Sequence, residues 1–403
     1  NKRMIYQLTG IIFQIIIDVG AFLGYSRALD WKKARQRPIK YSNFDIWIHA
    51  SSLGEYWMVH NLIRDFEKKG EKVFVSIFSP SAWEIVSKNE KYCGFIPIDR
   101  QKEIHHFVET INPKFVVIAK YDLWPVLSNV LYNKKIPYVI AFSQFHEHHH
   151  TLWKWNFLEN KIYRRALGVG HQTQKSLKLW QKSNFSNGFF CGDGRFDSIY
   201  HFRKKWTPLD EIDVFKGESK LFVLGSSWPR EESMTIPLIP KLSEVKFVIA
   251  PHRHQRASEI IKILDVPYIL MSEINIYEKQ ELIKSRVLIV DTMGQLKNIY
   301  GHSDFTFIGG GFQNGLHNIL EALIFGNIIT FGPKIKGHWE ASECKADVLG
   351  INSDSETLMQ WLSNLIDLDE KSLKQKISSG QDFVNKNIGA TARVMKFIGT
   401  NIN

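Results

Sequence analysis

The stretch "IWIHASSLGEYW", residues 46–57, reads as the end of a buried strand, a short polar turn and the start of a helix. Its first three residues are apolar, Ser51 and Ser52 are typical of a helix cap, and residues 56–66 have the spacing of an amphipathic helix. Glu55 therefore lies at a strand-to-helix junction. The helix dipole favours an acid in a first turn, so one interpretation of Glu55 is an electrostatic cap. The alternative is a catalytic carboxylate at the mouth of a cleft.

Apolar runs of strand length recur in both halves of the chain, separated by polar or amphipathic stretches. Nearly continuous apolar strands that alternate with helices indicate a parallel sheet covered on both faces. We expect two Rossmann-like halves that bind ligands at the carboxyl ends of their strands, in the crevice between the domains. The predicted strands lie in "DIWIHA" (45–50), "KVFVSIF" (72–78), "KFVVIAK" (114–120), "IPYVIAF" (136–142), "LFVLGSS" (221–227), "KFVIAPH" (246–252), "VLIVDT" (287–292), "FTFIGGG" (305–311) and "IITFGPK" (328–334).

The length of the chain, 403 residues, exceeds what one hydrophobic core usually supports, so two domains are expected. A polar stretch around residues 200–220 interrupts the alternation and is interpreted as the linker. The expected segments are an N-terminal membrane anchor with a basic segment (1–40), an N-terminal Rossmann-like domain (41–203), a linker (204–218), a C-terminal Rossmann-like domain (219–385) and a C-terminal helix (386–403).

The composition is that of a folded globular protein, with 44% hydrophobic and 23% charged residues. The formal net charge of +11 favours an anionic partner, and nucleic acid, an acidic membrane surface and a phosphorylated substrate all fit that description. The 3 cysteines are scattered and form no CxxC pair, which argues against a disulfide framework or a zinc site.

The N-terminal stretch, residues 4–25, is largely apolar but contains Gln7, Gln14 and Asp18. A spanning helix needs about 20 apolar residues, and an Asp at the bilayer centre costs about 2.5–3.5 kcal/mol. We expect an anchor that dips into or marginally spans the membrane, with the globular body on the cytoplasmic side; the alternative is a buried core helix. A basic cluster that attracts anionic headgroups would hold the anchor: Lys32, Lys33, Arg35, Arg37 and Lys40.

The stretch "FTFIGGGFQNGLHNILEA", residues 305–322, runs from a strand through three glycines to a helix expected to begin near His317. Consecutive glycines let the backbone approach a ligand, and the free amides of a helix start form an anion site. Asn318 and Glu321 are three residues apart and share one face of the first turn. The pattern favours a phosphate or nucleotide site, and a packing turn is the alternative. It is neither a GxGxxG fingerprint nor a Walker loop.

Two further strand ends carry candidate residues. In "FVIAPHRHQR", residues 247–256, histidines and arginines follow Pro251 as a cationic cluster that suits a phosphate, with an exposed basic loop as the alternative. In "VLIVDTMGQLKNIY", residues 287–300, a small flexible turn separates strand from helix. The histidine run at residues 145–150 lacks the spacing and the carboxylates of a metal site, and no GxSxG or Cys/His arrangement supports nucleophilic catalysis.

Six motifs, in this order and spacing, resemble the Kdo transferases, which attach 3-deoxy-D-manno-octulosonic acid (Kdo) to the lipid A precursor of Gram-negative bacteria. They are "WIHASSLGE" (47–55), "GDGRFDS" (192–198), "GSSWPREE" (225–232), "APHRHQR" (250–256), "VDTMGQLKNIY" (290–300) and "GGGFQNGLHNILEA" (309–322). The resemblance covers nearly the whole chain. The variants "KYDLWP" and "GSSWP" are most similar to the version of the family in Bacteroidota.

The resemblance implies an α/β fold of the GT-B type, with two Rossmann-like domains facing a central cleft. It implies a metal-independent, inverting transfer from CMP-Kdo to a hydroxyl of lipid IVA, with no cofactor, at the cytoplasmic face of the inner membrane. Glu55 stands where the family's general base stands, in the motif WxHxxSxGE. Arg195 stands at the position of the basic residue thought to stabilise the transition state, where lysine is commoner.

The resemblance also implies a CMP site in the C-terminal domain. Its residues are Pro251, His252, Met293, Gly294, Gln295, Asn318, Ile319, Leu320 and Glu321. The sequence departs from the family where "ETELWPN" is commoner: Lys120 replaces the first acid of that motif and Asp122 the second. Either Lys120 takes the role as a cation, or Asp122 serves with a shorter reach, or the site is altered. "PHRHQR" and "MGQL" also differ from the commoner "PRHPER" and "MGEL".

Two other functions remain as alternatives. One is a GT-B transferase that uses a UDP-sugar, which the "WIHASSLGE" motif disfavours. The other is a basic, non-catalytic protein that binds anionic inner-membrane lipids. A nucleic-acid partner is not expected, because aromatic and basic residues are not interleaved.

Overall fold

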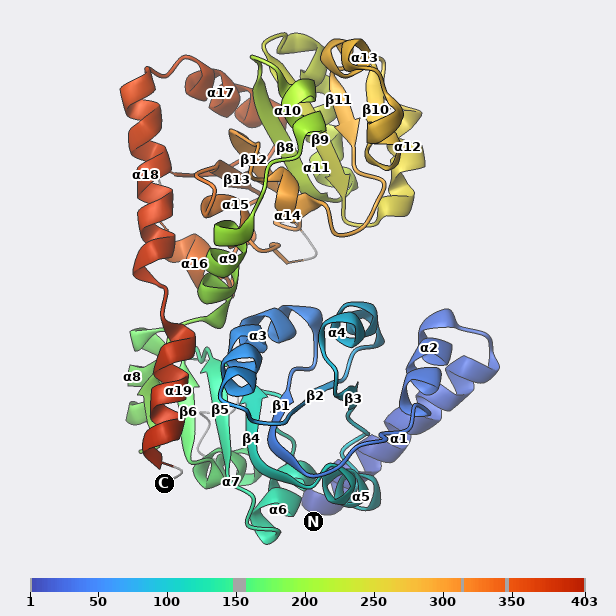
Figure 1. Cartoon of the computed structure of the whole chain (residues 1–403), viewed down its shortest axis with the longest axis vertical. Helices are drawn as coiled ribbons and strands as arrows, with labels where there is room; N and C mark the ends of the chain where they lie inside the picture. The colour runs from blue at the N-terminus through green and yellow to red at the C-terminus, as the bar shows by residue number, and fades with distance from the viewer. Residues whose placement is uncertain (1, 148–156, 313–314, 345–347, 402–403) are drawn as a thin grey trace. The chain divides into compact units, whose positions relative to one another are not determined.

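The computed structural model describes residues 2–147, 157–312, 315–344 and 348–401, and the chain divides into two compact units. Unit 1 contains residues 1–198 and 387–403, and unit 2 contains residues 199–386. Each unit is an α/β domain built on its own seven-stranded parallel sheet (Figure 1). The expected linker, residues 204–218, contains the end of one helix and the whole of another, and lies in unit 2.

The sheet of unit 1 has the strand order β3-β2-β1-β4-β5-β6-β7, and all neighbouring strands are parallel. Its chain order reverses between β1 and β4, which makes the carboxyl ends of these two strands the topological switch point, where such sheets bind ligands. The strands are β1 (Phe44–His49), β2 (Val73–Ile77), β3 (Cys93–Phe95), β4 (Pro113–Ala119), β5 (Tyr138–Ser143), β6 (Gly168–His171) and β7 (Gly188–Phe190).

Two separate apolar cores cover the two faces of this sheet. Ile46 and Ile48 of β1 point into one core, and Trp47 points into the other, as the two-residue period of a strand requires. The helical segments of unit 1 are α1 (Lys2–Phe22), α2 (Ser26–Arg35), α3 (Leu53–Lys68), η1 (Pro80–Ala82), α4 (Trp83–Asn89), α5 (Gln101–Ile111), α6 (Pro125–Asn133), α7 (Phe157–Arg165), α8 (Gln174–Lys182), α9 (Gly194–Lys205), which continues into unit 2, and α19 (Ala390–Asn401).

The sheet of unit 2 has the order β10-β11-β9-β8-β12-β13-β14, again parallel throughout, with its switch point between β8 and β12. Its strands are β8 (Lys220–Ser227), β9 (Val245–Pro251), β10 (Tyr268–Leu270), β11 (Val287–Ile289), β12 (Phe305–Ile308), β13 (Ile328–Phe331) and β14 (Leu349–Ile351). Its helical segments are α10 (Asp210–Lys216), α11 (Pro229–Thr235), η3 (Ile236–Lys241), η4 (His254–Arg256), α12 (Ala257–Ile261), η5 (Met271–Ile276), α13 (Lys279–Lys284), α14 (Leu296–Ile299), α15 (Leu320–Leu323), α16 (Trp339–Glu343), α17 (Ser355–Ile366) and α18 (Glu370–Lys386).

All nine predicted strands are present as β1, β2, β4, β5, β8, β9, β11, β12 and β13. The expected helix at 56–66 is α3, which begins at Leu53. The fold of two parallel α/β domains is therefore confirmed.

The N-terminal helices α1 and α2 form a hairpin in unit 1. No helix in the described part of the chain is both long and apolar enough to cross a membrane, and the predicted anchor is unconfirmed. Asp18 of α1 accepts a hydrogen bond from Gln14 at 2.9 Å and pairs with Lys32 of α2 at 3.0 Å, and these two contacts hold the pKa of Asp18 below its usual value. The polar side of α1 thus faces α2.

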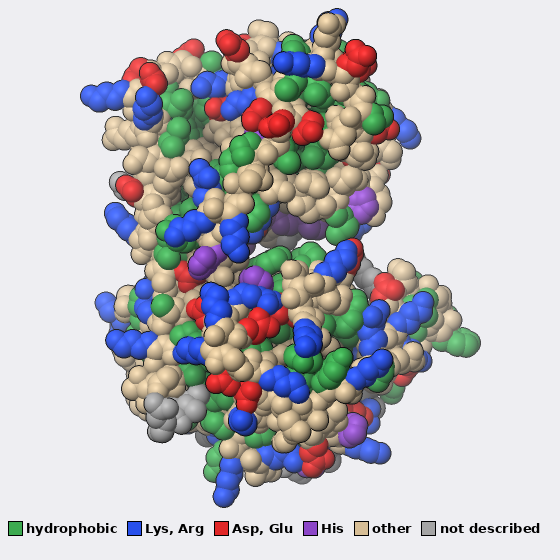
Figure 2. Space-filling view, viewed as in Figure 1, with side chains coloured by type: hydrophobic (Ala, Val, Ile, Leu, Met, Phe, Trp, Pro, Cys, Tyr) green, Lys and Arg blue, Asp and Glu red, His purple; other side chains and the backbone are tan. Residues whose placement is uncertain are grey.

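The opposite side of α1 is apolar and exposed. Its exposed side chains follow the helical spacing i, i+3, i+4, i+7, and they are Ile12, Ile15, Ile16, Val19 and Phe22. Basic and apolar side chains lie together on the visible surface of this hairpin (Figure 2). The predicted basic cluster is not uniformly exposed, because Arg35 turns inward: its guanidinium lies 3.5 Å from the ring centroid of Trp31 and donates to the carbonyl oxygen of Phe78 at 2.9 Å.

The C-terminal helix α19 returns to unit 1. Val394 and Ile398 are buried in the core that contains β1, and the carboxylate of Asp197 accepts hydrogen bonds from the backbone amides of Gly389 and Thr391, each at 2.6 Å. The Thr391 amide lies in the first turn of α19 and the Gly389 amide directly before it, so Asp197 satisfies donors at the start of this helix.

Candidate active site

The turn between β1 and α3 has the geometry of a capping box. The hydroxyl of Ser52 accepts a hydrogen bond from the Glu55 amide at 3.4 Å, and the Glu55 carboxylate accepts one from the Ser52 amide at 3.2 Å. The cap interpretation of Glu55 is therefore correct. It does not exclude the other interpretation, because one backbone amide uses only part of the capacity of a carboxylate.

Lys120 and Asp122 follow β4, the strand next to β1, and lie close enough to Glu55 to interact with it electrostatically. Burial of the carboxylate, together with the negative charge of Asp122 and a hydrogen bond to it, raises the pKa of Glu55 to about 7. Lys120 acts in the opposite direction. A carboxyl group that titrates near neutral pH is suited to general-base catalysis, since it is both available as the base and able to hold a proton.

The backbone at Lys120 adopts a left-handed conformation, with a φ of 54°. Its amide donates to the carbonyl oxygen of Ala141 at 2.8 Å, and its own carbonyl oxygen accepts from the hydroxyl of Ser143 at 2.8 Å. A non-glycine residue with positive φ is uncommon and is held in place by its surroundings. The end of β5 therefore fixes the turn that carries Lys120 and Asp122.

A buried polar network supports the turn between β1 and α3, and the sequence alone did not predict it. His49 lies between two hydroxyls, with Nδ1 2.7 Å from Ser76 Oγ and Nε2 3.0 Å from Ser51 Oγ. Trp47 donates its indole N–H to Ser76 Oγ at 2.7 Å. Burial lowers the pKa of His49 to about 4, partly opposed by Asp122, so the ring is neutral at neutral pH. The Trp and His of the "WIHASSLGE" motif thus position the turn before Glu55.

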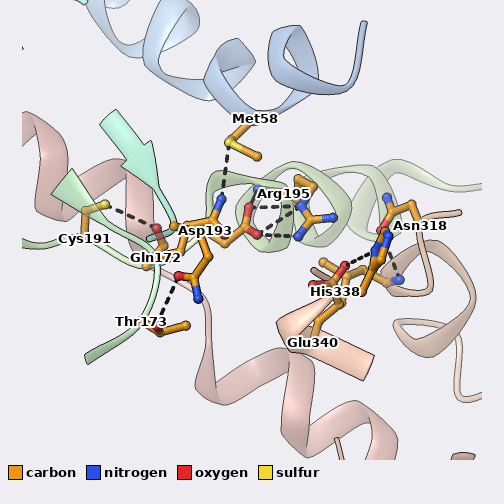
Figure 3. Close-up of polar contacts among 12 residues, drawn as sticks. Met58, Gln172, Thr173, Cys191, Asp193, Arg195, Asn318, His338 and Glu340 are labelled. Atoms are coloured by element: carbon orange, nitrogen blue, oxygen red, sulfur yellow. Dashed lines mark hydrogen bonds and ion pairs between the residues drawn. The ribbon is translucent and has the colours of Figure 1, made fainter. Parts of the chain in front are cut away.

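Arg195, in the first turn of α9, forms a bidentate pair with Asp193. Its Nε lies 3.0 Å from one carboxylate oxygen and its Nη2 lies 2.6 Å from the same oxygen, while the other oxygen lies 3.2 Å from Nε (Figure 3). Asp193 is buried, which makes it a fixed support for the guanidinium. The pair therefore fixes the orientation of the Arg195 guanidinium.

In unit 2, a buried carboxylate links the two chain segments that follow β8 and β12 at the switch point. Glu231, the third residue of α11, is 1% exposed. One of its oxygens accepts from the Gly310 amide at 2.8 Å and the other from the Trp228 amide at 3.1 Å. Burial raises the pKa of Glu231, and these amides oppose that rise. Glu231 therefore connects the end of β8 to the glycine turn after β12.

The glycine turn is partly a packing device, as the alternative interpretation stated. A Cβ at Gly309 would lie 2.1 Å from the carbonyl oxygen of Ser226, and one at Gly311 would lie 2.6 Å from the amide nitrogen of Gly332. Gly310 has a φ of +90°. The expected helix start near His317 is wrong: α15 begins at Leu320 and has only 4 residues. The anion site at the start of this helix stays a prediction.

The predicted CMP residues of unit 2 differ in what they can offer a ligand. Asn318 donates to Glu321 at 3.3 Å, as the spacing predicted, whereas the side chains of Ile319 and Leu320 are fully buried. Met293 is 67% exposed. Gly294 has a φ of +85°, Gln295 precedes α14, and Pro251 ends β9.

His252 is part of a ring stack that sequence analysis missed. Its imidazole stacks on the indole of Trp228 and also on the imidazole of His317, with centroid distances of 4.6 and 4.7 Å. The Trp228 indole N–H donates to Nε2 of His317 at 3.4 Å. Burial lowers the pKa of both histidines, that of His317 to about 4. Since Trp228 and His317 are 89 residues apart, no local pattern could have paired them.

The predicted cationic cluster after β9 is weaker than its sequence suggests. Arg256 pairs with the buried Glu232 at 2.6 Å and with Glu259 at 2.5 Å, so its charge is compensated within unit 2. Burial and the neighbouring Arg253 lower the pKa of His252, which favours its neutral form. In the described part of the chain, no group of three or more His, Cys, Asp or Glu side chains could hold a metal ion, and the histidine run at 148–150 lies outside the described residues.

Comparisons with known proteins agree with the motif pattern. Residues 23–198 match the sequence profile of the 3-deoxy-D-manno-octulosonic-acid transferase (kdotransferase) family. The 3-deoxy-D-manno-octulosonic acid transferase of Haemophilus influenzae is 23% identical over 88% of this chain and 86% of its own length. A bifunctional glycosyltransferase/methyltransferase of Fusobacterium nucleatum is 25% identical over 71% of this chain, which spans 47% of that relative's length.

A solved structure supports the fold alone. The crystal structure of UDP-GlcNAc 2-epimerase from Neisseria meningitidis bound to UDP-GlcNAc superposes with a TM-score of 0.62 and 13% identity, over 88% of this chain and 100% of that one. The fold is thus shared with GT-B-like proteins. The match of residues 23–198 to the family profile and the similarity of 88% of the chain to a curated Kdo transferase both support the Kdo transferase family.

Proposed function

We propose that this protein transfers Kdo from CMP-Kdo to a hydroxyl of lipid IVA, with inversion at the anomeric carbon, without a metal ion, and with Glu55 as the general base. The observation that carries the proposal is the environment of Glu55, whose pKa is raised to about 7 at the switch point of unit 1. A glutamate that only caps the helix is favoured in its ionised form, whereas Asp122 next to Glu55 disfavours ionisation.

In the proposed reaction, the acceptor hydroxyl attacks the anomeric carbon of Kdo as the bond from that carbon to the phosphate oxygen of CMP breaks. The electron pair of the broken bond leaves with CMP, and the hydroxyl proton passes to Glu55. Positive charge near the leaving phosphate stabilises the transition state, and Arg195 is the residue we assign to that role. Asp193 is assigned the orientation of Arg195, because it holds one edge of the guanidinium.

We assign Lys120 and Asp122 the role of adjusting the pKa of Glu55. The cation lowers the pKa of Glu55 and the anion raises it, so the pair sets the pH at which the base becomes available. We assign the binding of the donor CMP-Kdo to unit 2. The binding residues are Pro251, His252, the turn 293–295 and the segment 318–321. For Ile319 and Leu320 this assignment uses the backbone, since their side chains are buried.

We also propose that the protein works at the cytoplasmic face of the inner membrane, with α1 lying in the interface. The exposed apolar side of α1 and the exposed Lys33 and Lys40 after it are the features of an interfacial helix near anionic lipids.

The test is CMP release from CMP-Kdo, generated in place because it is labile, with and without lipid IVA. We expect acceptor-dependent release by the wild type and a loss of about 100-fold or more in Glu55→Gln, the range of a lost general base. Glutamine is accepted at the same position of a capping box, so this variant keeps the helix cap. Near-normal turnover by Glu55→Gln would disprove the general-base assignment. A competition experiment between CMP and UDP tests the donor. Binding of UDP in preference to CMP would favour a UDP-sugar donor.

A further inference from the structure

Unit 1 contains a large cavity that the proposed chemistry does not use. Its volume is about 1070 Å³, and its walls come from α1, α2, η1, the start of α4 and the end of β3. Ligand pockets commonly measure about 300–1,000 Å³, so the cavity can hold a substantial group. Glu55, Lys120 and Asp122 are not among its lining residues.

The lining of this cavity is suited to an alkyl chain. Ile16, Ile17, Trp31, Trp83 and Phe95 provide apolar surface. Small residues, among them Gly20, Ala28 and Ala34, leave room between them. Hydroxyl groups of Tyr25, Ser26, Ser79 and Ser81 also line the cavity, but most of its exposed surface is apolar, which favours a hydrocarbon that gains by leaving water.

The rim of the cavity carries charge. Lys33 and Arg37 line it together with one acid, Asp30, which leaves an excess of one positive charge. The Arg37 guanidinium lies 4.4 Å from the ring centroid of Trp83, so this cation is held against the apolar wall. A phosphate group attached to the alkyl chain complements such a rim.

Two structural connections indicate which lipid occupies the cavity. Ile16 lines the cavity and is also 61% exposed within the apolar side of α1, so the lining is continuous with the surface proposed to meet the membrane. On another wall, the amides of Phe78 and Ser79 donate to the carbonyl oxygen of Ser51 at 3.3 and 2.8 Å, which joins the cavity to the turn that carries Glu55.

We infer that this cavity binds a fatty acyl chain of the phosphorylated lipid acceptor, with Lys33 and Arg37 at its phosphate. The inference rests on the proposed function for the identity of the acceptor. It assigns the α1–α2 hairpin a part in substrate binding as well as in membrane contact, and it predicts that the enzyme discriminates against an acceptor without acyl chains.

The direct test is photocrosslinking of the full chain with a lipid IVA analogue that carries a diazirine on an acyl chain. We expect labelled peptides from α1–α2 and from residues 79–83. Ser81→Trp places a large side chain at an exposed position of the cavity wall and should abolish this labelling. Labelling at other sites, or unchanged labelling of Ser81→Trp, would overturn the inference, as would equal labelling by a diazirine phosphatidylglycerol in vesicles, which would identify a bilayer lipid as the occupant.

The kinetic test compares lipid IVA with its deacylated form. Ser81→Trp should raise the KM for lipid IVA about tenfold, the loss expected for about two buried methylene groups, and leave the KM for CMP-Kdo and for the deacylated acceptor unchanged. The double variant Lys33→Gln/Arg37→Gln should also raise the KM for lipid IVA. Its charge-matched control, Lys69→Gln/Lys102→Gln, removes two exposed cations of unit 1 outside the cavity and should have no effect.

Crosslinking does not require turnover, so the two proposals fail separately. Specific labelling of the cavity without any CMP release would contradict the proposed function and retain the acyl site. Acceptor-dependent CMP release with no preference for the acylated acceptor would retain the function and contradict the acyl site.

Discussion

Glu55 and Glu231 occupy the same local position in the two units. Each is the third residue of the helix that follows the first strand of its sheet, and each accepts a hydrogen bond from the amide at the start of that helix, at 3.2 Å for Glu55 and 3.1 Å for Glu231. The difference comes from the strand across the switch point. In unit 2 it supplies the Gly310 amide, whereas in unit 1 it supplies Lys120 and Asp122.

This comparison shows that the local motif does not determine the role of the carboxylate. Glu231 has both oxygens bound by backbone amides, so we assign it the positioning of the glycine turn. Burial raises the pKa of Glu55 to about 7, and the negative charge of Asp122 adds to that rise, so its proton equilibrium lies near neutral pH. The neighbouring strand therefore makes one glutamate a structural support and the other a candidate base.

The largest effect is expected from removing the carboxylate of Glu231, which positions the glycine turn. Glu231→Ala leaves the buried amide of Gly310 and the amide of Trp228 without their acceptor, which should lower the free energy of unfolding of unit 2 by about 2–3 kcal/mol. Thermal unfolding followed by circular dichroism measures the change. Glu218→Ala removes an exposed acid of the same unit and serves as the control, with an expected change within about 0.5 kcal/mol. Equal stability of the two variants would contradict the assigned role of Glu231.

The pH dependence of kcat/KM tests the other half of the comparison. Activity should rise with pH through about 7 as Glu55 loses its proton. Asp122→Asn removes a charge that raises this pKa, so the acidic limb should move to lower pH, by about one unit. Lys120→Gln removes a charge that lowers it, so the limb should move to higher pH. Shifts in the same direction for both variants would show that these residues do not act on Glu55 by charge.

The raised pKa of Glu55 should also make the stability of the protein depend on pH. The folded pKa of Glu55, about 7, lies above its ordinary value of 4.5, so folding favours the protonated form. The resulting stabilisation is complete below pH 4.5 and is lost as the pH rises through 7. Relative to Glu55→Gln, the wild type should therefore become less stable over this range. The test is to measure the melting temperatures of the wild type and of Glu55→Gln over this pH range. Parallel curves for the two proteins would contradict the raised pKa of Glu55.

The smallest effect is expected at the cap itself. Ser52→Ala removes the hydroxyl that accepts from the Glu55 amide and should cost about 1 kcal/mol of stability. The Ser52 amide, which contacts the carboxylate, is kept, so the acidic limb of the pH profile should stay in place. Chemical denaturation and the pH profile of the same variant separate the two functions of the turn. A displaced limb would show that capping and basicity are not independent.

The central part of the fold was predictable because its strands are buried on both faces and are therefore apolar throughout. The five strands that were missed are short: β3, β7, β10 and β14 are three-residue edge or near-edge strands, and β6 contains Gly168 and Gly170 among its 4 residues. Three or four residues are too few to establish a strand pattern in the sequence. The register of these strands is imposed by the neighbouring strands that are already in place.

The candidate site was predictable only where it is local in the sequence. The position of Glu55 follows from its own turn, and Asn318 and Glu321 from helical spacing. The contact between Glu55 and Asp122 depends on β4 lying next to β1, and the stack of Trp228, His252 and His317 depends on three separate strand ends. The start of α15 was misjudged because the glycine turn continues past His317 before the backbone becomes helical.

The return of α19 to unit 1 affects how the protein is made. A ribosome releases residues 1–198 before unit 2, but it synthesises the buried residues Val394 and Ile398 and the partners of Asp197 only after unit 2. Until then the apolar surface that α19 covers stays exposed on the nascent chain. Unit 2 is complete in sequence before unit 1 is, so the domain that begins first finishes folding last, and chaperones have that interval in which to bind it.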